Sequence, residues 1–264
     1  MQKIVPCLWF SNQAEEAAEY YVSVFRDSGI VDVKRFGKGS RAPEGSVMAV
    51  SFRIHGYEFA ALNTGPDSNF TPAISFFVNC GTREEVDEIW AEFSEGGSPL
   101  MELGEYPFSE RYGWIRDKYG VTWQLMLAPQ AAKIVPSLLF VGAQYRKAEE
   151  AMRLYTSQFK DSQVNSIERY DPGQGEAEDA VMYGSFTLAG QEFVAMDSGL
   201  EHAFTFTEAI SLMVSCEDAN QVIMLTENLS SGGLKQPGGW LKDRYGVSWV
   251  VTRSHRAEPG TFLA

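Results

Sequence analysis

The sequence contains an internal repeat, and this feature most limits what the chain can fold into. Blocks from the first half return in the same order in the second half. The clearest begins at Gly113 as GWIRDKYGVTW and returns at Gly239 as GWLKDRYGVSW. Self-similarity of this kind indicates repeated structural units. We therefore expect two equivalent domains joined by a short linker around 128–132, at residues 1–128 and 133–254, followed by a loose tail at 255–264.

Each copy shows the same series of predicted elements twice. A strand at 3–10 precedes a helix whose apolar face has helical spacing, from Ala14 to Phe25. Three short strands are predicted next, near 30–37, 47–54 and 57–63. The order then restarts with a strand at 73–79, a helix at 82–95 that Thr82 is expected to cap, and strands near 99–106, 111–117 and 121–127. The chain is therefore predicted to be βαβββ four times, an α+β fold.

Several motifs together carry a family resemblance: Ile4-Val5-Pro6-x-Leu8-x-Phe10, Asn63-x-Gly65-Pro66, Glu85-Val86-Asp87-x-x-Trp90 and Asp117-x-Tyr119-Gly120-Val121-x-Trp123-Gln124. As a set they resemble the PhnB-like family of the vicinal oxygen chelate (VOC) superfamily, which includes glyoxalase I, bleomycin-resistance proteins and dioxygenases. Some PhnB-like members carry the label 3-demethylubiquinone-9 3-methyltransferase. The resemblance implies tandem VOC domains, each made of two βαβββ modules curled around a cleft. It does not supply an activity, because one fold hosts many.

The resemblance also implies where a divalent metal would bind in catalytic members of the superfamily. By position, the first ligand falls near Pro6 and Pro136, and the last falls at Gln124 and Val250. Proline and valine have no donor atom, and an amide oxygen is a weak ligand. The predicted fifth strand offers no imidazole or carboxylate, and the three histidines are scattered, at His55, His202 and His255. We therefore expect no metal and no other cofactor.

The methyltransferase label predicts a particular sequence feature. A conventional S-adenosylmethionine enzyme has a glycine-rich turn inside a parallel βαβ unit. The candidates here, Gly37-Lys38-Gly39 and Gly173-Gln174-Gly175, are predicted to be hairpin loops between antiparallel strands. This context is wrong for that cofactor.

The expected ligand site is a pocket in the first copy. Strand alternation places Phe10 on the same face of its strand as Pro6 and Leu8. It places Met126 on the same face as Thr122 and Gln124. For each of these residues, packing in the hydrophobic core is the alternative to ligand contact. An aromatic segment found only in the first copy is predicted to cover the pocket, and Arg116 to hold an anionic group unless it is a solvated charge. Asn63 corresponds to Asp197 in the second copy. The predicted ligand-binding residues are Phe10, Asn63, Tyr106, Phe108, Arg116, Gln124 and Met126.

Three other repeated features have structural explanations. Trp114 and Trp123 recur at identical spacing from a turn, and Asp117 precedes a Tyr-Gly turn that it is expected to stabilise. Cys80 and its counterpart Cys216 stand just before a helix, where a thiol can be activated, although a buried and inert thiol is the preferred interpretation.

Charge and cysteine content restrict the partners and the compartment. The formal net charge is −13 and the pI is about 4.7. This balance argues against nucleic acid and anionic membrane surfaces as partners. Three sparse cysteines fit a reducing cytoplasm, and no signal peptide is recognisable. The expected partner is a small molecule; the two repeats would form an internal pseudo-dimer, and homodimerisation stays open.

Two functions remain open from the sequence. The favoured one is a metal-independent binding protein for a small apolar, aromatic or anionic molecule. The alternative is an enzyme of the glyoxalase, bleomycin-resistance and dioxygenase superfamily whose reaction is unknown.

Overall fold

The computed structural model describes residues 2–40, 42–63, 69–128, 133–173 and 175–253. The chain divides into two compact units. Unit 1 combines residues 1–69 with 208–264, and unit 2 comprises residues 70–207. Most of the predicted linker and the predicted tail lie outside the described residues.

The first repeat contains two βαβββ modules. The first is made of β1 (Ile4–Trp9), α1 (Ala14–Val24), β2 (Gly29–Arg35), β3 (Val47–Ile54) and β4 (Tyr57–Leu62). The second is made of β5 (Ile74–Cys80), α2 (Arg83–Ser94), β6 (Ser98–Tyr106), β7 (Ser109–Arg116) and β8 (Thr122–Leu127). The predicted order of elements is confirmed.

The second repeat has the same order with a shorter last module. The third module is β9 (Lys133–Val141), η1 (Gly142–Gln144), α3 (Ala148–Gln158), β10 (Gln163–Arg169), β11 (Val181–Leu188) and β12 (Gln191–Ser198). The fourth is β13 (Ile210–Cys216), α4 (Ala219–Leu229), β14 (Leu234–Lys235), η2 (Pro237–Gly239), β15 (Trp240–Lys242) and β16 (Ser248–Arg253).

Each compact unit takes one module from each repeat, which corrects the expectation that the repeats fold as separate domains. The sheet of unit 1 has the order β14-β15-β16-β13-β1-β4-β3-β2, and that of unit 2 has the order β10-β11-β12-β9-β5-β8-β7-β6. Antiparallel pairing of β1 with β13 and of β5 with β9 joins the modules. The segments 1–128 and 133–254 therefore repeat the same elements, but neither segment forms one compact unit by itself. Because the four modules are so alike, sequence could not show which of them pair.

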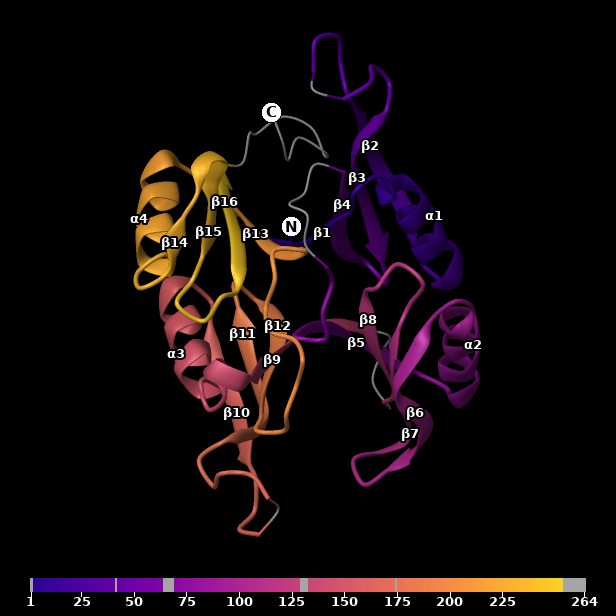
Figure 1. Ribbon diagram of the computed structural model, residues 1–264, viewed down its shortest axis with the longest axis vertical. Coiled ribbons are helices and arrows are strands. Elements are labelled where there is room, and N and C mark those ends of the chain that lie inside the picture. The colour runs from indigo at the N-terminus through magenta and orange to yellow at the C-terminus, as the bar shows by residue number, and fades with distance from the viewer. Residues whose placement is uncertain (1, 41, 64–68, 129–132, 174, 254–264) are drawn as a thin grey trace. The chain divides into compact units, whose positions relative to one another are not determined.

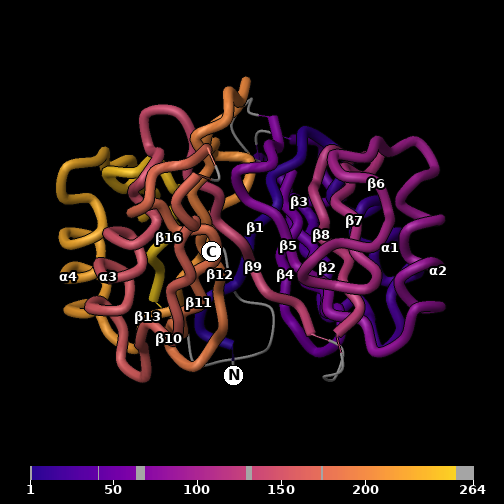
Figure 2. The backbone as a smooth tube through the Cα atoms, turned by 90° about the horizontal axis from the view of Figure 1, so that it is seen from below, coloured from indigo at the N-terminus to yellow at the C-terminus, as the bar shows by residue number. Residues whose placement is uncertain are grey.

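Both helices of a unit pack on the same face of its sheet (Figure 1). In unit 2 the ring of Phe93 from α2 stacks on Trp123 of β8 at 5.3 Å. Met152 from α3 fills the space over Gly184 of β11, where a Cβ would lie 2.6 Å from its methyl carbon. Figure 2 shows the strands of this unit between α2 and α3. The opposite face of each sheet is called the helix-free face below.

The sheet of unit 2 curls around its helix-free face. The rings of Phe77 on β5 and Tyr183 on β11 have centroids 6.4 Å apart, although β9 and β12 lie between their strands. Three inter-strand steps in a flat sheet would span roughly 14 Å. Side chains from distant strands therefore meet in one cluster on this face.

An aspartate holds the turn before the last strand of each repeat, as predicted. Asp117 Oδ1 accepts hydrogen bonds from the backbone N–H groups of Tyr119 and Val121, and Oδ2 accepts one from Trp123 Nε1 at 2.8 Å. Asp243 makes the three equivalent contacts, at 2.9–3.0 Å. The aspartate thus ties the turn to the tryptophan that packs under the helix.

Candidate ligand-binding face

The helix-free face of unit 2 carries a polar group within an apolar surround. Strand alternation and the pairing register place Ser75 and Gln124 on this face. The apolar surround includes Phe77, Val135 and Val194, with Trp114 and Met126 packed against them. An apolar surface with a few placed polar groups is typical of small-molecule sites.

A chain of hydrogen bonds crosses the centre of this face. Tyr112 on β7 donates its hydroxyl to Gln124 Oε1 at 2.6 Å, and Gln124 Nε2 donates to Ser75 Oγ at 2.8 Å. All three side chains are buried. Burial, with a smaller contribution from Tyr106, raises the pKa of the Tyr112 phenol, so Tyr112 acts as a neutral donor. Gln124 is therefore held in one orientation.

The hydroxyl groups of Ser75 and Ser137 are neighbours at the end of this chain. They occupy paired positions of β5 and β9, and each residue is only 1% exposed. Residues opposite each other in such a pair have Cβ atoms about 5 Å apart. Ser137 Oγ has no hydrogen-bond partner within the described residues, and Ser75 Oγ has only its bond from Gln124. Two buried hydroxyls thus keep unused donor capacity.

Other unsatisfied polar atoms lie on the same face. Within the described part of the chain, Trp114 Nε1, Arg116 Nε and Asn79 Oδ1 are also buried without a hydrogen-bond partner. Alternation along β7 and β5 places all three on the face of Gln124. Buried polar groups are normally satisfied, so a cluster of exceptions needs an explanation.

The aromatic segment unique to the first copy is an ordered hairpin. It connects β6 to β7, and the rings of Tyr106 and Phe108 pack edge-on against Tyr112 at 5.4 and 5.0 Å. Tyr106 also donates to Glu102 O at 2.9 Å, while Phe108 is 61% exposed. The hairpin therefore covers the phenol that orients Gln124.

The corresponding face of unit 1 has different chemistry. Val250 stands at the position of Gln124, and Cys7 at that of Ser137. Trp9 and Trp240 have ring centroids 4.2 Å apart, and Trp9 Nε1 donates to Ser211 Oγ at 3.2 Å. These side chains belong to, or pack on, an apolar cluster.

The structure brings five of the seven predicted site residues into one unit: Tyr106, Phe108, Arg116, Gln124 and Met126. Phe10 and Asn63 belong to unit 1. Phe10 and Gln124, which were expected to wall one pocket, therefore belong to different units. Tyr112, Ser75 and Ser137 were not among the residues predicted from the sequence.

The face assigned to the first strand was also wrong. Val5, Cys7 and Trp9 lie in the helix-free cluster of unit 1, so Pro6 and Leu8 point to the helix side. The same shift applies in β9, where Val135 and Ser137, not Pro136, share the face of Phe77. These strands are buried on both faces, so their sequence has no alternation to reveal the inner one.

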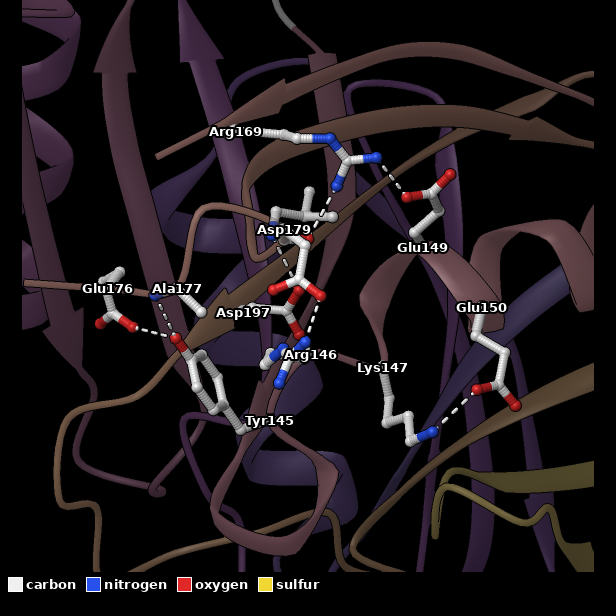
Figure 3. A network of polar contacts seen from close by, with 11 residues as sticks. Tyr145, Arg146, Lys147, Glu149, Glu150, Arg169, Glu176, Ala177, Asp179 and Asp197 are labelled. Atoms are coloured by element: carbon white, nitrogen blue, oxygen red, sulfur yellow. Dashed lines mark hydrogen bonds and ion pairs between the residues drawn. The ribbon is translucent and has the colours of Figure 1, made fainter. Parts of the chain in front are cut away.

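Asn63 and its counterpart Asp197 position the first helix of their modules. Asn63 Oδ1 accepts from the N–H of Ala14, and its amide donates to Val47 O. In Figure 3, Asp197 lies beside the chain that leads into α3; it accepts from the N–H groups of Ala148 and Val181. Asn63 also lines a surface pocket of about 440 Å³, but its side-chain bonds hold secondary structure together.

The donors on the helix-free face of unit 2 do not fit a divalent metal. They are hydroxyls and the amides of Gln124 and Asn79, and Gln124 Oε1 already accepts from Tyr112. Metals of this class prefer imidazole, thiolate or carboxylate ligands. Among the described residues, no group of three or more His, Cys, Asp or Glu is placed to hold a metal ion.

The three cysteines are free and buried. Burial raises the pKa of each thiol, to about 12 for Cys80, where Glu85 adds to the effect. The preferred interpretation of Cys80 and Cys216 as inert thiols agrees with this environment.

Comparisons with known proteins identify the family. The model of the 3-demethylubiquinone-9 3-methyltransferase family matches residues 2–126 and again residues 132–252. The chain belongs to this family. Its two matches coincide with the two sequence repeats, each of which contains two modules of the α+β fold. None of the curated proteins compared with the chain matches it.

Several solved structures are similar to this chain. A putative 3-demethylubiquinone-9 3-methyltransferase (PhnB protein) from Bacillus cereus is 43% identical over 48% of this chain and 100% of its own, with a TM-score of 0.46. Glyoxalase I from Zea mays is 12% identical over 95% of this chain and 91% of its own, with a TM-score of 0.58. A putative dioxygenase from Bacillus subtilis is 9% identical over 94% and 83%, with a TM-score of 0.54. The last two show a shared fold.

Two structural findings bear on the expectations from sequence. The glycine-rich segment at 37–39 connects the antiparallel strands β2 and β3, as predicted, and so lacks the parallel context of a conventional methyl-donor site. No helix among the described residues is long and apolar enough to cross a membrane.

Proposed function

We propose that this protein binds a small molecule, without a metal, on the helix-free face of unit 2. The observation that carries the proposal is the pair of buried hydroxyls at Ser75 and Ser137, of which Ser137 has no partner within the described residues. Leaving a buried polar group unpaired costs about 1–3 kcal/mol. A ligand oxygen that accepts from both hydroxyls would remove this cost.

The surround favours a ligand with an apolar or aromatic body. Phe77, Trp114 and Met126 offer rings and a thioether, and the Tyr106 hairpin covers the region next to them. Gln124, fixed by Tyr112 and Ser75, orients the polar end. We include a cytoplasmic location in the proposal because the three thiols are free and buried.

The test is a screen of aromatic ketones, amides and carboxylates for compounds that raise the unfolding temperature, followed by titration calorimetry. Ser137→Cys installs the side-chain type found at the matched position of unit 1, and should weaken binding several-fold, as expected for about 1 kcal/mol. Cys7→Ala is the matched control and should leave the affinity unchanged.

The outcomes separate the two functional classes. Binding that survives dialysis against a chelator and weakens only in Ser137→Cys supports the proposal. Binding that is unaffected by Ser137→Cys, or lost after chelation, contradicts it. Conversion of the bound compound, followed by mass spectrometry, would favour the alternative, an enzyme of the superfamily.

A further inference from the structure

Arg116 is a partly buried cation that has no acidic partner among the described residues. It lies at the end of β7 on the helix-free face of unit 2, and its Nε is buried with no hydrogen-bond partner among the described residues. No ion pair of Arg116 is formed within the described part of the chain. An uncompensated charge that is partly withdrawn from water is destabilising.

In the second repeat, the cation at the equivalent position is neutralised by a carboxylate. Lys242 occupies the position of Arg116 and forms an ion pair with Glu208 at 2.8 Å. The segment Phe206-Thr207-Glu208-Ala209-Ile210 corresponds to Phe70-Thr71-Pro72-Ala73-Ile74 in the first repeat. Pro72 therefore stands where the other repeat supplies the carboxylate.

The neighbouring donors point to the same missing partner. Trp114 Nε1, two residues before Arg116 on the same strand face, is also buried and has no acceptor in the described part of the chain. Indole and guanidinium groups can only donate hydrogen bonds, so what they lack is an acceptor. Trp114 is the register partner of Gln124, which places this end of the strand next to the polar centre of the face.

We infer that the ligand of unit 2 is an organic anion, whose acidic group takes the place of the missing carboxylate beside Arg116. This inference rests on the proposed function and adds the charge of the ligand to it. The apolar body would lie against the Phe77 and Met126 cluster, and the acidic group against Arg116 and Trp114. A charge-assisted hydrogen bond is roughly twice as strong as a neutral one, so charge should dominate selection.

The experiment compares two carboxylates, benzoate and phenylacetate, with the uncharged amides of the same shape, benzamide and phenylacetamide. Thermal stabilisation and calorimetric titration of the full chain are measured at low salt. We expect the carboxylates to bind at least 10-fold more tightly than the amides.

Two variants eliminate the unpaired cation in different ways. Arg116→Met deletes it, and Pro72→Glu supplies the carboxylate that the second repeat has, so either should abolish the preference for the carboxylate. Lys242→Met, in unit 1, is the matched control and should retain it. In the absence of ligand, Arg116→Met should unfold at the same temperature as the parent protein or higher, since no partner is lost.

The results test the anionic character of the ligand separately from the proposed binding site. Carboxylates and amides that bind equally, with binding still reduced by Ser137→Cys, would overturn the anion inference and leave the proposed site. Failure of all four probes to bind would overturn the inference for aromatic acids. A marked loss of stability in ligand-free Arg116→Met would also overturn it, because it would reveal a partner within the protein.

Discussion

The hydroxyl of Tyr112 donates to the amide oxygen of Gln124 across 2.6 Å, inside a face that is otherwise apolar. This bond joins the hairpin that is unique to the first repeat to Gln124. The counterpart of Gln124 in the second repeat is Val250, which has no amide. It fixes which end of the amide faces Ser75, and so determines the hydrogen-bonding character of the candidate site.

The Tyr112–Gln124 pair should be energetically coupled. Gln124→Val, which copies the counterpart Val250, leaves the Tyr112 hydroxyl buried without an acceptor and should lower the free energy of unfolding by about 1–3 kcal/mol. Tyr112→Phe removes the same bond from the other side. Urea denaturation of both single variants and the double variant should give a coupling energy of at least about 0.5 kcal/mol. Strict additivity would show that the bond does not form.

Ser75 and Ser137 should respond differently to removal of their hydroxyls in the ligand-free protein. Ser75→Ala takes away the acceptor of Gln124 Nε2 and should cost about 1–2 kcal/mol. Ser137→Ala removes a hydroxyl with no partner within the described residues, and should change stability by less than about 0.5 kcal/mol or increase it. Equal losses, measured by denaturant unfolding, would mean that Ser137 already has a partner.

Glu149 should make part of the stability of unit 2 dependent on acid. Hydrogen bonds from Arg169 and then Arg153 hold its pKa below the ordinary value of 4.5. Its stabilising contribution is therefore complete above that value and is lost as the pH falls through the lowered pKa. Glu149→Gln should destabilise the protein by less than about 1 kcal/mol at neutral pH, since the pair is partly exposed, and the difference should vanish in acid. A difference that grows as the pH falls would contradict this.

The thiols should be unreactive until the protein unfolds. Because burial raises the pKa of Cys7, Cys80 and Cys216, almost no thiolate exists at pH 8. Titration with a disulfide reagent should detect no fast-reacting thiol in the native protein and 3 after denaturation in urea. Rapid labelling of one native cysteine would identify an accessible, activated thiol that the structure does not explain.

Much of the local structure could be predicted from the sequence because its signals are local. Helical spacing located α1, the Thr82 cap located α2, and the Asp117 turn was recognisable from Asp-x-Tyr-Gly. Thr82 Oγ1 indeed accepts from the N–H of Glu85 at 3.1 Å. Each of these depends on residues within a few positions of one another.

The candidate site depends on relationships that one sequence does not display. The inner face of β1 could not be found because Ile4 through Trp9 are all buried, so no polar side marks the outer one. Gln124 was noticed because it differs from its counterpart Val250 in the second repeat. Tyr112 lies in a segment that the second repeat lacks, so no such comparison was possible for it. Ser75 and Ser137 become neighbours only through the pairing of β5 with β9, 62 positions apart in the chain (137 − 75).

The exchange of modules between the repeats makes each half of the chain an incomplete fragment. Severed near residue 130, the first fragment would carry β1 and β5 as exposed edges, since their antiparallel partners β13 and β9 are in the other fragment. Such edges readily pair with other chains. The two fragments should therefore refold only by complementation, and the covalent connection keeps them at a fixed one-to-one ratio. It also leaves each of the four modules free to change independently, which a symmetrical assembly of identical short chains could not allow.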